Sequence, residues 1–134
     1  MKRRIILSTL LLSGCVSINK TYWLLRNDIA NHKWHVPIHN KALPSSATFT
    51  LSKNVKYSGT FSGFGGCNKY SGKYYATSYS ISFKLTKVGN KNCFNLYKEK
   101  EFLKNILRTK RMYIKDNKLI FVSKNHDRLM ELER

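Results

Sequence analysis

Residues 57–75 read YSGTFSGFGGCNKYSGKYY, and this stretch decides the fold more than any other part of the chain. It holds five of the seven glycines, one of the three cysteines and four of the eight tyrosines. Its flanks alternate as β-strands do, whereas its middle predicts a tight bend. We expect Gly65, Gly66 and Gly72 to serve positive φ angles or close backbone approach. No Gly-Lys-Ser/Thr follows, so we interpret the bend as structural and not as a nucleotide-binding loop.

Period-2 alternation continues on both sides of this stretch and predicts further half-buried strands. A strand over 34–38 would be irregular or at an edge, because Pro37 cannot donate a ladder hydrogen bond. Residues 22–25 predict a first strand, 88–94 a loop, 112–122 a hairpin and 128–132 a last strand. The predicted inward-facing positions are Trp34, Val36 and Ile38; Ala47, Phe49 and Leu51; Val55, Tyr57, Gly59 and Phe61; and Tyr79, Ile81, Phe83 and Leu85.

Residues 95–108 change to helical spacing, and Asn95 suits the N-cap. The predicted buried positions are Leu96, Phe102, Leu103, Ile106 and Leu107, and the predicted solvent-facing ones are Lys98, Glu99, Lys100, Glu101 and Lys104. Together the segments predict a mainly β (α+β) domain: one antiparallel β roll or small barrel-like sheet of six to eight strands with one helix packed on it.

The first 14 residues have the pattern of an export signal. A basic cluster, Lys2 to Arg4, precedes an apolar run that is too short for a transmembrane helix, and small residues follow. Leu12-Ser13-Gly14-Cys15 resembles the bacterial lipobox, in which the cysteine is lipidated after cleavage. We therefore predict a lipoprotein signal peptide at 1–14, lipidation of Cys15, a tether at 15–21 and one domain at 22–134.

Two cysteines remain after Cys15 is set aside. An even pair in an exported protein is consistent with one Cys67–Cys93 disulfide. Two buried free thiols that pack together are the alternative.

The net charge is strongly positive. Three of the 25 Lys and Arg residues lie in the predicted signal peptide, which leaves 22 against seven acids, a net charge of +15. Such a charge attracts anionic surfaces, and outside the cytoplasm these are envelope components and not nucleic acid. The lysines are scattered, so an ordinary solvated surface is the alternative interpretation.

The segment Gly66-Cys67-Asn68-Lys69-Tyr70-Ser71-Gly72-Lys73-Tyr74 resembles the Gly-Cys-Asn-x-Tyr-x-Gly-x-Tyr signature of the META domain (HslJ-like) family of bacterial lipoproteins. The likeness extends over about residues 20–132 and includes Trp23-x-Leu25 near its start. The resemblance implies a β-rich fold with a helix and a cell-envelope or secreted setting, without an established reaction. For Gly66, Cys67, Asn68, Tyr70, Gly72 and Tyr74 we expect structural roles.

Catalytic and metal-binding patterns are weak. His32, His35 and His39 lie within eight residues, but Asp28 is the only carboxylate or thiol near them, so we predict no metal site. A nucleophile formed by Cys67 or Cys93 with His126 competes with the disulfide. The few acids give no paired carboxylates for acid–base chemistry. We expect no catalytic residues, no cofactor and no enzyme activity.

Two functions stay open. The first is a monomeric, lipid-anchored envelope protein that supports envelope integrity or stress tolerance through binding of anionic envelope components or an envelope protein. It would face the periplasm from the outer membrane in a Gram-negative cell. The second is a β-barrel that holds a small hydrophobic or anionic ligand. A core filled by Phe49, Phe61, Phe83, Phe102 and Phe121 favours the first, and an open apolar cavity favours the second.

Overall fold

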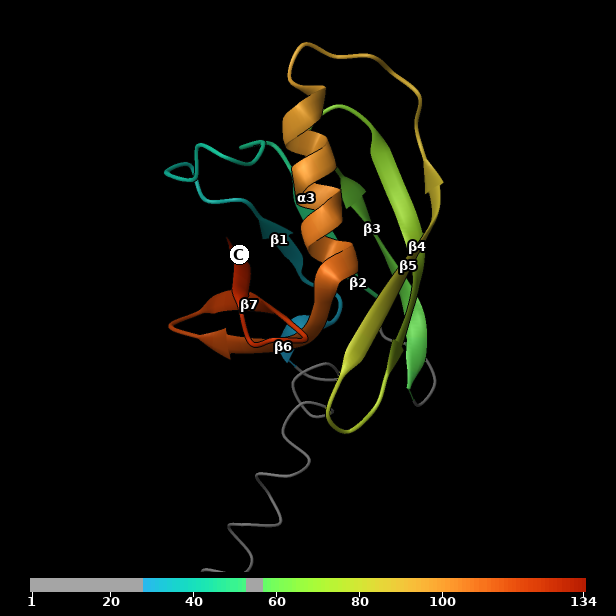
Figure 1. Cartoon of the computed structure of the whole chain (residues 1–134), viewed down its shortest axis with the longest axis vertical. Helices are drawn as coiled ribbons and strands as arrows, with labels where there is room; N and C mark the ends of the chain where they lie inside the picture. The colour runs from blue at the N-terminus through green and yellow to red at the C-terminus, as the bar shows by residue number, and fades with distance from the viewer. Residues whose placement is uncertain (1–27, 53–56) are drawn as a thin grey trace, which may run out of the picture.

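The computed structural model describes residues 28–52 and 57–134 (Figure 1). The predicted signal peptide, Cys15, the tether, the strand at 22–25 and Val55 lie outside the described residues. None of the helices formed by the described residues is long and apolar enough to cross a membrane.

The described chain forms an eight-stranded antiparallel sheet and a helix, as the sequence predicts. The elements are β1 (Lys33–His35), β2 (Thr48–Leu51), β3 (Ser58–Phe64), β4 (Lys69–Ala76), β5 (Ile81–Val88), α3 (Leu96–Arg108), β6 (Thr109–Lys115), β7 (Lys118–Ser123) and β8 (Arg128–Glu133). The strand order is β5-β4-β3-β2-β1-β8-β7-β6, so the sheet ends at β5 and β6 and is not closed into a barrel.

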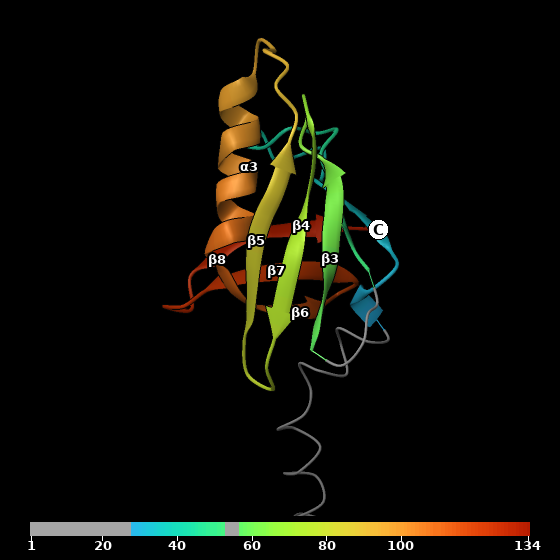
Figure 2. The same ribbon diagram turned by 90° about the vertical axis from the view of Figure 1, so that its right-hand side faces the viewer.

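The sheet bends strongly, so its two parts face each other. β3, β4 and β5 form one layer, and β6, β7 and β8 run across behind them (Figure 2). α3 covers the open side between the two edge strands and contacts β5 and β7. This arrangement encloses one hydrophobic core and leaves the far side of β3–β5 facing solvent.

The core is filled by aromatic side chains from both parts of the sheet and from the helix. The rings of Phe61 and Phe83 lie 5.0 Å apart and those of Phe49 and Phe121 lie 5.2 Å apart, all edge to face. Phe102 of α3 is fully buried against Tyr70 of β4, with 6.0 Å between the ring centroids. Edge-to-face rings at these distances attract one another and exclude water.

Several predicted boundaries are wrong for local reasons. β1 stops at His35, and Ile38 is 79% exposed, because Pro37 cannot extend the ladder. Tyr57 and Tyr79 are exposed instead of inward-facing, since they lie beside the ends of β3 and β5. β5 continues to Val88, into the predicted loop.

The helix boundary is close to the prediction. Asn95 occupies the N-cap but its side chain makes no capping hydrogen bond, and Leu107 is exposed instead of buried.

Candidate functional site

The bend between β3 and β4 is formed by residues 65–68. The Gly65 N–H donates to the Asn68 carbonyl at 2.8 Å, and Gly66 adopts a φ of +107°, which favours glycine. A Cβ on Gly65 would lie 2.5 Å from Oε1 of Glu99. The two glycines therefore have separate roles: Gly66 turns the chain and Gly65 admits a carboxylate.

Glu99, on the first turns of α3, points into this bend. Its Oε1 accepts the backbone N–H groups of Cys67 at 3.1 Å and Asn68 at 2.6 Å. Its Oε2 accepts the Asn68 side-chain amide at 2.9 Å. Glu99 is only 2% exposed, and within the described residues its partners are these donors and not a cation. A buried carboxylate with several charge-assisted hydrogen bonds is a strong local constraint.

Asn68 extends the same network to the segment that follows β5. Its Oδ1 accepts the Lys91 N–H at 2.7 Å, and its Nδ2 donates to the Lys91 carbonyl at 3.1 Å. Cys67 is bonded to Cys93 in a disulfide, with the Cα atoms 5.9 Å apart. We call Cys67, Asn68, Lys91, Cys93 and Glu99 the Glu99 cluster. It joins the bend, the β5–α3 loop and the helix.

The prediction that Glu99 faces solvent is wrong. The sequence nevertheless contains a signal: positions 99, 102, 103 and 106 have the i, i+3, i+4, i+7 spacing of one helix face, so Glu99 occupies the first position of the apolar stripe. A charged residue is normally predicted to face solvent, so the charge of Glu99 outweighed its position on the apolar stripe. The physical reason for its burial is the bend, whose backbone N–H groups need an acceptor.

The two signature tyrosines lie on the inner face of β4, each across a glycine of β3. The register pairs Tyr70 with Gly63 and Tyr74 with Gly59, and a Cβ on either glycine would lie within 2.7 Å of the facing tyrosine. The Tyr70 hydroxyl passes over Gly63 and donates to the Thr48 carbonyl on β2 at 2.5 Å. The glycines of β3 therefore make room for rings that connect β4 to β2.

Tyr74 makes the same kind of connection by donating to the Ser52 carbonyl at 2.9 Å. Burial raises the pKa of both Tyr70 and Tyr74, because the phenolate form would lose its hydration. Both rings remain neutral at ordinary pH, which suits hydrogen-bond donors in a core and offers no catalytic base.

These signature residues lie in a segment that matches a known family. The sequence model of the META domain matches residues 17–134. The chain belongs to the META domain family. In this META domain the signature residues Gly66, Cys67, Asn68, Tyr70 and Tyr74 form the bend, the disulfide and the tyrosine connections. Membership of the family supports a non-enzymatic, envelope-type protein.

Two solved structures resemble the META domain in fold. A DUF4847 family protein from Bacteroides vulgatus has a TM-score of 0.61 at 15% identity, and the match covers 79% of this chain and 94% of that chain. A protein from Burkholderia xenovorans, solved by NMR, has a TM-score of 0.57 at 22% identity, with 79% and 83% covered. Likeness at these identities shows the fold alone. A comparison with curated protein sequences gave no match.

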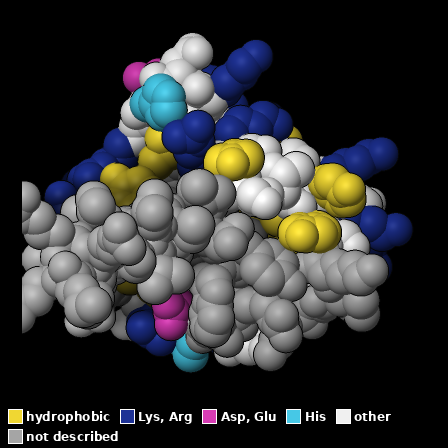
Figure 3. All heavy atoms as spheres, turned by 90° about the horizontal axis from the view of Figure 1, so that it is seen from below, with side chains coloured by type: hydrophobic (Ala, Val, Ile, Leu, Met, Phe, Trp, Pro, Cys, Tyr) yellow, Lys and Arg dark blue, Asp and Glu magenta, His cyan; other side chains and the backbone are white. Residues whose placement is uncertain are grey.

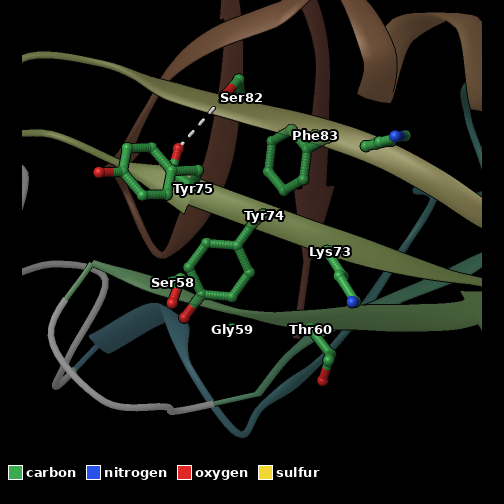
Figure 4. Close-up of a pocket in the computed structure, with 9 residues that line it drawn as sticks. Ser58, Gly59, Thr60, Lys73, Tyr74, Tyr75, Ser82 and Phe83 are labelled. Carbon is green, nitrogen blue, oxygen red and sulfur yellow. Dashed lines mark hydrogen bonds between the residues drawn. The ribbon is translucent and has the colours of Figure 1, made fainter.

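The outer face of β1–β5 in the META domain is polar and basic. We call it the basic face; its exposed lysines are Lys33, Lys69, Lys73, Lys84 and Lys87, and serine and threonine side chains lie among them. Figure 4 shows part of it, with Thr60 and Lys73 side by side on neighbouring strands. Two shallow hollows of about 550 and 590 Å³ lie on this face.

The three histidines that were considered as metal ligands and for which no metal site is predicted do not form a cluster among the described residues. His32 lies edge-on to Trp34, 6.4 Å between centroids, and its Nε2 is 3.4 Å from Nη1 of Arg134. His35 ends β1 and His39 follows in an exposed loop, so strand alternation does not place them together. Over residues 28–52 and 57–134, no group of three His, Cys, Asp or Glu side chains could hold a metal ion.

The cysteine nucleophile considered from the sequence has no free thiol, because Cys67 and Cys93 are bonded to each other. His126 lies in the exposed turn between β7 and β8, with a φ of 69°. The groups that the structure brings together in this META domain are therefore structural, and the remaining candidate for function is the outer surface.

Proposed function

We propose that this META domain is a lipid-anchored cell-envelope protein that acts by binding through its outer surface and not by catalysis. The observation that carries the proposal is the filled interior. Phe49, Phe61, Phe83, Phe102 and Phe121 are all buried and pack in the space that a ligand-binding barrel would leave open. A ligand or partner of this domain therefore binds on the outer surface.

The second candidate, a barrel that holds a small ligand, fits this geometry poorly. Small-molecule sites are concave and bury most of the ligand's surface. The hollows on the basic face are shallow and open to solvent. The sheet itself is open, with α3 placed against its gap.

Anchoring is proposed through Cys15, whose flanking sequence resembles a lipobox. One acyl chain gives only marginal, reversible membrane binding, so a stable anchor takes a second signal, either a further acyl chain or a basic surface. An anchored position also fits a net charge of +15 after cleavage, since the domain would be held near anionic envelope components.

The experiment compares wild type, Cys15→Ser and Ser17→Ala in cells labelled with an alkyne fatty acid. We expect label and membrane association in wild type and Ser17→Ala, and neither in Cys15→Ser. Detergent-solubilised wild type is then used to capture partners, with Cys15→Ser beside it. Unlabelled wild type would reject the anchor. A small molecule that co-purifies without a protein or polymer partner would reject binding through the surface.

A further inference from the structure

The charge of the META domain is divided unevenly along the chain. All seven acidic residues lie at position 28 or after position 98, and none lies from Ile29 to Lys98. This acid-free segment contains the whole of β1–β5. On the end of the molecule seen from below, Lys and Arg side chains are spread widely over the described surface and acidic ones are sparse (Figure 3).

The strand register aligns the outward-facing residues of the basic face, including its lysines, in rows across the strands. One row crosses all five strands, because the register pairs neighbouring outward-facing residues in turn: Lys33, Thr50, Ser62, Ser71 and Lys87. Strands lie about 4.8 Å apart, so the row spans roughly 19 Å with a lysine at each end and hydroxyl groups between them. A second row begins with Thr60 and continues through Lys73 and Lys84.

Lys73 and Lys84 are directly opposite each other on β4 and β5. Like charges at such positions oppose folding. On the other part of the sheet, Lys118 is countered by Glu131 at 3.7 Å. The described residues provide no carboxylate partner for Lys73 or Lys84. An uncompensated pair of cations on a rigid surface is a feature that an anionic partner would neutralise.

We infer that the basic face binds an extended anionic glycan, a polymer of sugars that carry carboxylate or phosphate groups. The lysines bind the anionic groups and the serine and threonine hydroxyls between them hydrogen-bond to the sugar oxygens. The two hollows, about 550 and 590 Å³, take successive units of one chain. This inference rests on the proposed function, because it assigns a partner class to the outer surface.

Other anionic partners fit the basic face less well. A membrane-binding surface combines cations with exposed apolar side chains that enter the lipid, whereas Thr50, Ser62 and Ser71 separate Lys33 from Lys87. The aromatic side chains beside this row, Phe64 and Tyr70, are half-buried and buried. Single-stranded nucleic acid needs successive aromatic platforms. Tyr75, 62% exposed, lies beside Ser58 and Ser82 in the hollow that also contains Lys73 and Lys84, so this hollow offers one exposed aromatic platform and not a series.

The test uses full-length protein in a neutral detergent and fluorescent polygalacturonate as the probe. We expect saturable binding that weakens as salt rises, and no binding to uncharged dextran. Lys73→Gln/Lys84→Gln should bind about tenfold more weakly, since each exposed charge contact contributes modestly. The matched control, Lys100→Gln/Lys104→Gln on the exposed side of α3, removes the same charge and should change affinity less than about twofold.

Three outcomes would overturn the inference. Equal losses in both double variants would mean that net charge alone attracts the polymer, and would overturn it. Tighter binding to duplex DNA or to anionic lipid vesicles, or no binding of polygalacturonate, would also overturn the inference. Lys33→Gln/Lys87→Gln, at the two ends of the row, should reproduce the loss if the first double variant folds poorly. Anchored protein that does not bind the polymer rejects only this inference, whereas unanchored protein that binds it rejects only the anchor.

Discussion

Polar groups on the two faces of strands β3–β5 have opposite environments. On the inner face and at the bend, polar groups meet partners within the chain: Glu99 accepts three hydrogen bonds, Asn68 uses its whole amide, and Tyr70 reaches a carbonyl on β2. On the outer face, Lys73 and Lys84 lie opposite each other without an acidic partner among the described residues.

Within the same strands, the inner face and the bend serve stability, and the outer face is available for interaction. Groups with all their partners inside the chain hold the bend, the loop and the helix together, and they offer nothing to a ligand. Groups without partners contribute little to folding and are available to another molecule. Substitutions on the inner side should therefore change stability, and substitutions on the outer face should change binding.

The largest expected effect follows from removing the carboxylate at the bend. Glu99→Ala leaves two backbone N–H groups and an amide without their acceptor in a buried site, and we expect the free energy of unfolding to fall by about 4 kcal/mol. Glu99→Gln keeps the volume and one acceptor oxygen, and we expect a loss of about 2 kcal/mol. Urea denaturation followed by circular dichroism measures both.

Glu101→Ala is the matched control for this prediction, because Glu101 is exposed on the same helix. We expect its effect to stay within about 0.5 kcal/mol. If Glu101→Ala costs as much as Glu99→Ala, helix propensity and not the Glu99 cluster explains the loss.

The next effect concerns the disulfide that fixes the bend to the β5–α3 loop. Cys67→Ser/Cys93→Ser opens a loop of 26 residues, which should cost about 3 kcal/mol in the chain-entropy account. Thermal unfolding of the purified proteins checks it. Cys15→Ser, which leaves the bridge intact, should unfold at the wild-type temperature, and an unchanged double variant would show that the hydrogen bonds of Asn68 and Glu99 are sufficient.

A smaller, pH-dependent effect is expected at Tyr70. Burial raises the pKa of Tyr70 above its usual value of about 10. Below about pH 10 the folded and unfolded chains both hold the proton, so the stability from Tyr70 is fully present. As pH rises further, the unfolded chain releases the proton first, and stability is lost by about 1 kcal/mol between pH 10 and 11.

Tyr70→Phe tests this sign directly. At pH 8 it should cost about 1 kcal/mol, because the hydrogen bond to Thr48 is gone. Since the variant lacks the titrating group, the gap from wild type should close towards pH 11. A gap that widens for Tyr70→Phe would mean that the Tyr70 hydroxyl is not buried as a donor.

The smallest stability change is expected on the outer face. Lys73→Gln/Lys84→Gln removes a like-charge pair from neighbouring strands, so the free energy of unfolding should stay constant or rise by about 0.5 kcal/mol. A urea midpoint at low salt measures it. A clear loss of stability would show that these lysines support the fold, and the contrast between the two faces would be wrong.

The sequence predicted the strand pattern well where alternation was regular. Ala47, Phe49 and Leu51 are buried as expected, and the helix, the hairpin at 112–122 and the last strand are confirmed. Alternation failed at element ends: Ile38 follows Pro37, and Tyr79 lies in the turn before β5. Alternation of apolar and polar residues does not by itself indicate where a strand ends.

The candidate site was only partly predictable. The glycine-rich bend and the Cys67–Cys93 pair followed from residue types, and both are confirmed. The burial of Glu99 did not follow, because its acceptor role depends on a bend more than 30 residues earlier in the chain. The basic face was missed because its lysines are scattered in sequence and gather only through the register of β1–β5.

The most direct test of the contrast is lysine acetylation read by mass spectrometry, with and without polygalacturonate, on the full-length protein in detergent. If the basic face binds the polymer, Lys33, Lys69, Lys73, Lys84 and Lys87 should be protected from acetylation, while Lys100 and Lys104 on α3 should react as in the free protein. Protection spread evenly over both groups, or confined to α3, would contradict the assignment of interaction to the outer face of β1–β5.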